Sequence, residues 1–194
     1  MSDILKVYKT ELAWSLLNDD ANGKDKGVYH FDLILLDDYS VMGLIKGSFS
    51  NPCFLFGVNI PDIGFLFTAL NLNNKNSVPV TYTAAKQLNG SPDTYYGMIQ
   101  YNCPQGDINA GNCVIKATPK QMSPYDLDNY IDEIANVQDM LDGDNSSFVA
   151  QYYDSLLSEE TASQQVIKIG NLATYARNNP VSNSDKRIET MLTK

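Results

Sequence analysis

Basic residues are scarce in this chain, and they form no cluster. Lysine and arginine together number 14 against 23 aspartates and glutamates, which gives a formal net charge of −9 and an isoelectric point near 4.4. A nucleic-acid partner requires clustered Lys and Arg side chains that neutralise phosphates. The sequence therefore argues against nucleic-acid binding, and its acidity also disfavours an anionic membrane surface.

Long apolar segments are missing as well. No uninterrupted apolar run approaches the roughly 20 residues that a spanning helix requires. Residues 1–7 lack the basic flank, the long apolar segment and the small-residue cleavage site of a secretory signal. We therefore expect a soluble, cytoplasmic protein with no membrane span, unless an export system that needs no such signal acts on it.

Cysteine and histidine are too few for the common metal sites and disulfide frameworks. Cys53, Cys103 and Cys113 make an odd number without framework spacing, which suits a reducing compartment. Cys103 and Cys113 flank a predicted hairpin tip and could pair in an oxidising compartment, but without a signal peptide we favour free thiols. The nucleotide, zinc-protease and serine-hydrolase signatures are also absent. We therefore predict neither a metal nor a cofactor.

Strand-like sequence, by contrast, dominates the first 120 residues. Residues 28–36 and 41–45 are β-branched, aromatic and aliphatic, with a polar connection between them, which predicts two strands. Alternating apolar residues over 54–60 and 63–67 place one face of each strand in a core. Further strands are predicted at 5–17, 78–83, 95–103 and 113–117.

These strands, six to nine in number and joined mostly by short polar loops, predict an antiparallel β-sandwich or barrel. Glycines inside or beside the strands favour a bend, a bulge or a close backbone approach, so we expect a curved sheet. The glycines concerned are Gly43, Gly47, Gly57 and Gly64.

Helical patterns begin after residue 120. Ser123 is a good N-cap, Pro124 suits the first helical position, and apolar residues follow at helical spacing to Leu141 before Gly143 ends the helix. Two further helices are predicted at 147–157 and 158–178, and a short one around 186–192. The helix at 158–178 is expected to pack through Ala162, Val166, Ile169, Ala173 and Ala176.

The sequence therefore predicts an α+β, mainly β protein in two parts. Residues 1–120 form an antiparallel β-sandwich domain, or a barrel. Residues 121–194 form an acidic segment of three to four short helices, with 12 acidic and 5 basic residues and hence a net charge of −7. Helices with such regular apolar faces must bury them, either on the sandwich or on a neighbouring subunit.

Tyrosine is the most informative residue type for function, with 12 in the chain. Its large apolar face and polar tip suit binding surfaces, and turn-rich loops at 18–27, 71–77 and 104–112 offer further contacts. The candidate binding residues are Tyr82, Tyr95, Tyr96, Tyr101, Asp107, Asn109 and Asn112. The favoured function is a non-enzymatic binding module that recognises a protein or a carbohydrate.

Two alternatives stay open. The first is a self-assembling structural protein, a homo-oligomer in which the helical tail makes the subunit contact. The second is a hydrolase in which His30 and Asp32, two apart on one strand face, act with Cys53 as nucleophile. Cys53 precedes Phe-Leu-Phe and reads as a buried small hydrophobe, so no catalytic residue is assigned.

Overall fold

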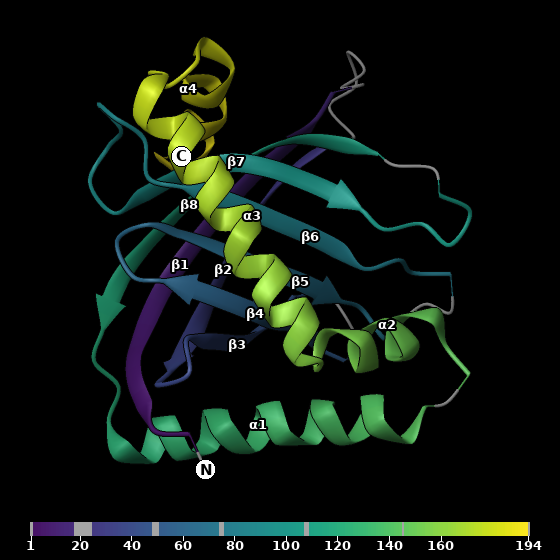
Figure 1. Cartoon of the computed structure of the whole chain (residues 1–194). Helices are drawn as coiled ribbons and strands as arrows, with labels where there is room; N and C mark the ends of the chain where they lie inside the picture. Colours follow the sequence, from purple (N-terminus) through teal and green to yellow (C-terminus); the bar gives the residue numbers. More distant parts are fainter. Residues whose placement is uncertain are drawn as a thin grey trace.

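Each strand of the amino-terminal part pairs with the next along the chain, and the last pairs with the first (Figure 1). The computed structural model describes residues 2–17, 25–47, 51–73, 76–106, 109–144 and 146–193. The strands are β1 (Ile4–Leu16), β2 (Lys26–Leu36), β3 (Ser40–Ile45), β4 (Cys53–Ile60), β5 (Gly64–Leu70), β6 (Val80–Ala85), β7 (Thr94–Tyr101) and β8 (Ala110–Lys120). They form one closed antiparallel barrel.

The pairing of β1 with β8 decides between the two predicted architectures. In this pairing Leu12 lies opposite Ile115 and Trp14 opposite Cys113, so the first and last strands have no free edge between them. A sandwich would leave the strands in two sheets, whereas here a single sheet closes on itself. The mainly β class with carboxyl-terminal helices is confirmed, and of the sandwich and the barrel the structure shows the barrel.

The sheet carries glycine where the backbones of neighbouring strands approach each other most closely. A Cβ atom at Gly57 would lie 2.1 Å from the carbonyl oxygen of Leu66, and one at Gly97 would lie 1.8 Å from that of Thr83. No side chain fits at such distances. The predicted close backbone approach at Gly57 is therefore confirmed, and the sheet is curved.

Aromatic rings fill much of the barrel interior. Phe65 contacts Tyr8 and Tyr95 edge-on, with ring centroids 5.7 and 4.9 Å apart. Phe67 similarly lies between Phe31 and Tyr82, at 5.9 and 5.5 Å. These rings and the aliphatic side chains around them form one buried cluster that runs through the barrel.

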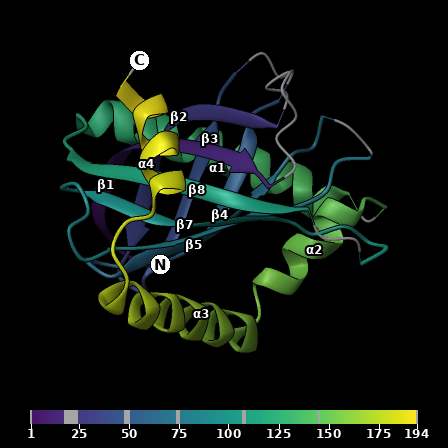
Figure 2. The same cartoon turned by 90° about the horizontal axis from the view of Figure 1, so that it is seen from above.

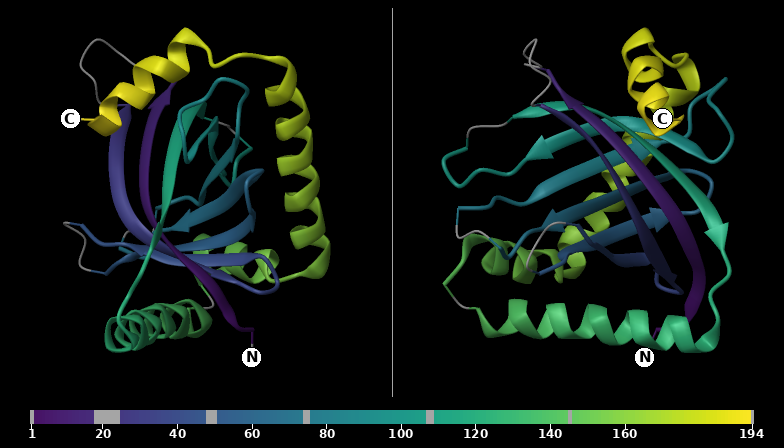
Figure 3. Two further views of the ribbon diagram at one scale, coloured as in Figure 1. Left: turned by 90° about the vertical axis from the view of Figure 1, so that its left-hand side faces the viewer. Right: turned by 180° about the vertical axis from the view of Figure 1, so that it is seen from behind.

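Helices cover several sides of the barrel from outside (Figure 3, left). They are α1 (Pro124–Gly143), α2 (Phe148–Leu156), α3 (Glu159–Asn178) and α4 (Asn183–Glu189), followed by a 3-10 turn, η1 (Thr190–Thr193). Each α-helix follows a serine whose side chain accepts a backbone N–H three residues ahead. These serines are Ser123, Ser147, Ser158 and Ser182. None of the described helices combines the length and the hydropathy needed to cross a membrane.

The helices bury apolar faces on the outer barrel surface. The buried face of α1, which includes Tyr130 and Ile134, packs against Leu44 and Phe54. The carboxyl-terminal half of α3 packs through Ile169 against the strands β4 and β5. Its amino-terminal half differs from the expectation, because Val166 is 43% exposed while Gln165 is only 5% exposed.

Candidate functional site at the barrel mouth

Alternate connections of an up-and-down barrel lie at the same end. The connections β1–β2, β3–β4, β5–β6 and β7–β8 form one end, here called the mouth, and the remaining three form the base. Of the loops predicted to bind a partner, at 18–27, 71–77 and 104–112, the described parts are therefore at the mouth, whereas residues 18–24, 74, 75, 107 and 108 lie outside the described ranges. Of their candidate residues, Asp107 lies outside the described ranges and Asn109 is exposed.

A cavity of about 330 Å³ opens at the mouth, and we call it the mouth cavity. Its lower wall consists of inward-facing strand residues, and its rim consists of residues from the β5–β6 connection. The lining residues are Tyr29, Ile45, Cys53, Ala69, Asn71, Asn76, Ser77, Val78, Val80, Tyr82 and Tyr101. Two of the four predicted tyrosines are thus brought together with a third, Tyr29, which the sequence did not single out.

Tyr82 is the most deeply placed of these phenols. Its side chain is 3% exposed, and its hydroxyl forms no hydrogen bond with any residue in the described ranges. Burial raises the pKa of Tyr82 well above its usual value, and the neighbouring phenols Tyr29 and Tyr101 raise it further. All three phenols line the mouth cavity, and because burial raises the pKa of each, each hydroxyl stays protonated at neutral pH and able to donate.

The other predicted tyrosines lie elsewhere. Tyr95 faces the interior near the base, where its ring contacts Phe65. Tyr96 faces outward beneath α4; its hydroxyl donates to Glu189 Oε2 at 3.0 Å and accepts the Ser91 N–H at 3.0 Å. Asn112 is half-buried on β8. These three side chains do not line the mouth cavity.

The structure does not bring the proposed hydrolase residues together. His30 Nδ1 lies 3.6 Å from Glu11 Oε1 on the outer surface, and Asp32 forms an ion pair with Lys120 at 2.7 Å. Cys53 belongs to the interior cluster, so the barrel wall separates it from His30. Burial also raises the pKa of the Cys53 thiol to about 12, which disfavours the nucleophilic thiolate at neutral pH.

The cysteines are free thiols, and Cys113 lies opposite Gly97 rather than Cys103. Within the described ranges, no three His, Cys, Asp or Glu side chains are placed to share a metal ion. Comparison with protein-family models, curated proteins and solved structures finds no match. The function is therefore inferred from the geometry alone.

Proposed function

We propose that the protein is a non-enzymatic binding module and that the mouth cavity takes a small ligand with an apolar ring and a hydroxyl group. The observation that carries this proposal is the Tyr82 phenol, whose hydroxyl has no hydrogen-bond partner among the described residues and faces a cavity with an aliphatic and aromatic lower wall. Ligand sites are typically concave, mostly apolar and about 300–1,000 Å³ in volume, with a few polar groups that orient the ligand.

The energetics support such a ligand. The Tyr82 hydroxyl reaches the open cavity rather than being fully enclosed, so a ligand hydroxyl that pairs with it adds about 0.5–1.5 kcal/mol, the net value of one hydrogen bond. The apolar body of the ligand would be covered by Ile45, Ala69 and Val80, at about 25 cal/mol per Å² of apolar surface removed from water.

The size and lining of the cavity also narrow the partner classes expected from the sequence. A folded protein would touch only the rim, so it would leave the Tyr82 hydroxyl without a partner. A sugar ring carries hydroxyl groups on every edge. Asn71 and Ser77 on the rim could pair with some of them, but the aliphatic side chains of Ile45, Ala69 and Val80 offer no partner to the others. An apolar ring with one hydroxyl matches the cavity better.

Binding of benzyl alcohol and toluene to the full chain tests this proposal, because the two probes differ mainly in one hydroxyl group. The fluorescence of Trp14, the only tryptophan, is a suitable signal, since Trp14 lies opposite Gly27, two residues from Tyr29. We expect Tyr82→Phe to weaken benzyl alcohol binding by about fivefold, the value of one neutral hydrogen bond, and to leave toluene binding unchanged.

The control is Tyr95→Phe, which removes the same atom near the base and should change neither affinity. Ala69→Leu fills the cavity from β5 and should abolish binding of both probes in a protein that still unfolds cooperatively. The proposal is wrong if neither probe binds to the parent protein, if Tyr82→Phe weakens both probes equally, or if Ala69→Leu binds as the parent protein does.

A further inference from the structure

A second cavity, of about 520 Å³, lies on the outside of the barrel, between β5–β7 and the helices α2 and α3. Figure 2 shows α3 passing along the outer side of the sheet, and Figure 1 shows α2 at its lower end. We call this cavity the helix groove and define it by Thr83, Gln100, Tyr152, Leu156, Gln165 and Lys168.

The polarity of the helix groove is unusual for a sheet surface covered by a helix. Under α1, and under the carboxyl-terminal half of α3, the outward strand residues are apolar, such as Phe54 and Val58. In the groove, the strand residues are mostly threonine, glutamine and asparagine. Among these, the side chains of Thr83 and Gln100 have no hydrogen-bond partner in the described ranges. Packing of the helix on the sheet does not require these polar groups.

Gln165 provides the second, independent observation. It lies on α3, lines the groove and is only 5% exposed, yet its amide makes no hydrogen bond with any described residue. A glutamine amide has two N–H donors and a carbonyl that accepts two hydrogen bonds. The amide atoms are not among the fully enclosed polar atoms, so they face the open groove. A ligand with hydroxyl groups in the groove would supply both donors and acceptors.

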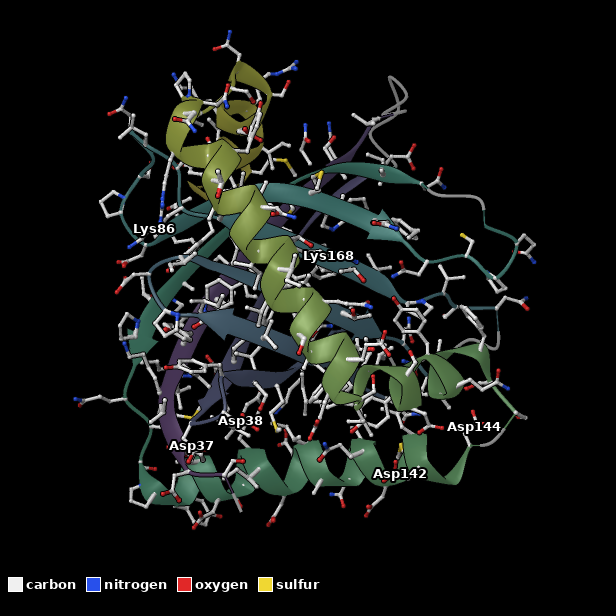
Figure 4. The ribbon with its side chains drawn as sticks, in the orientation of Figure 1. Asp37, Asp38, Lys86, Asp142, Asp144 and Lys168 are labelled. Atoms are coloured by element: carbon white, nitrogen blue, oxygen red, sulfur yellow. The ribbon has the colours of Figure 1, made fainter. Side chains whose placement is uncertain are left out.

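The groove also contains one positive charge and an apolar wall. Lys168 lies on α3 (Figure 4) and lines the groove, where it is the only charged side chain among the lining residues. It forms no ion pair with any described residue. Tyr152 and Leu156 of α2 add apolar surface to the same cavity.

We propose that the helix groove binds an acidic sugar. The amide of Gln165, with Thr83 and Gln100 across the groove, pairs with the sugar hydroxyls. Lys168 binds the carboxylate, and the C–H face of the ring packs against Tyr152 and Leu156. An extended peptide is a poorer match, because peptides commonly bind to a sheet edge and a closed barrel has none. This site is separate from the mouth cavity, and the two proposals fail or succeed independently.

Titration of the full chain with glucuronate and with glucose, followed by backbone amide NMR shifts, tests this proposal. We expect saturable binding of glucuronate, with shifts in β6, β7 and the first half of α3. Lys168→Gln should weaken glucuronate binding by about tenfold, the value of one charge-assisted hydrogen bond, and leave glucose binding unchanged. Tyr82→Phe, a mouth-cavity variant, should change neither.

Gln165→Leu separates a binding role from a structural one. It should weaken binding of both sugars by about tenfold or more while leaving the melting temperature unchanged or higher, because the Gln165 amide makes no hydrogen bond with a described residue that the substitution could break. Gln151→Leu, at an exposed α2 position outside the groove, is the matched control. The proposal is overturned if glucuronate does not bind saturably, if glucose binds as tightly, or if Gln165→Leu retains the parent affinity or unfolds the protein.

Discussion

Tyr130 joins α1 to the barrel through its hydroxyl group, so Tyr130→Phe tests how much this attachment contributes to stability. The Tyr130 hydroxyl donates to the carbonyl oxygen of Asp32 at 2.7 Å and accepts the N–H of Leu44 at 2.8 Å. Asp32 and Leu44 lie opposite each other on β2 and β3. The phenol is thus inserted into the strand ladder, and the missing side chain at Gly43 leaves room for it.

The magnitude of the effect follows from these two bonds. Phenylalanine keeps the ring but leaves one buried N–H and one buried C=O without their partner, at about 1–3 kcal/mol each. Part of this cost is recovered if the two strands close up and pair directly. We therefore expect Tyr130→Phe to lower the free energy of unfolding by about 2–4 kcal/mol, and the melting temperature by about 5–15 °C for a chain of this size.

Urea unfolding followed by circular dichroism measures this difference, with the slope of the transition checked for a change in the unfolded state. Tyr125→Phe is the matched control, since Tyr125 lies on the same helix and is 75% exposed. It should change the free energy of unfolding by less than about 0.5 kcal/mol. Equal midpoints for the two variants would refute the role assigned to the Tyr130 hydroxyl.

Two further predictions concern stability. Burial raises the pKa of Tyr8 and Tyr95 above 10.0, so above about pH 10 the folded state retains protons that the unfolded state has lost. The free energy of unfolding should therefore be flat below that pH and fall above it. Urea midpoints between pH 8 and about pH 11 that do not fall would contradict this. Gly57→Ala should cost about 2 kcal/mol or more, because its Cβ would lie 2.1 Å from a carbonyl oxygen. By contrast, Gly170 lies in open space on α3, so Gly170→Ala should raise the free energy of unfolding by about 1 kcal/mol. Thermal unfolding of the two variants measures both changes. If both substitutions changed the free energy of unfolding in the same direction, the close approach at Gly57 would be wrong.

The helices could be predicted from the sequence because their signals are local. Ser123, Ser147 and Ser158 cap the helices at the predicted positions, and each apolar pattern lies next to its cap in the chain. The choice between sandwich and barrel could not be made in this way. Closure depends on the pairing of β1 with β8, for example Leu12 with Ile115, and an alternating strand has the same pattern in either architecture.

The mouth cavity was only half predictable for a related reason. Tyr95 and Tyr96 are adjacent in sequence, but neighbouring residues of a strand face opposite sides, so one lies inside the barrel and the other outside. Tyr101 shares the interior with Tyr95 but lies at the other end of β7. Tyr29 was missed, although it alternates in phase with the interior residue Phe31. Its proximity to Tyr82 depends on strand pairing, which a single strand pattern does not contain.

The first turns of α3, at the helix groove, bury a different face from the one that the sequence predicted. Periodicity placed Val166 on the packed side of α3, but the structure buries Gln165 and exposes Val166. A rotation of the first turns that buried the valine would add an apolar contact, which the observed arrangement gives up. Departures of this kind from the local pattern are expected where a residue serves binding rather than folding. In the arrangement we propose, the α3 face that packs through Ile169 and Ala173 forms part of the ligand site one turn earlier.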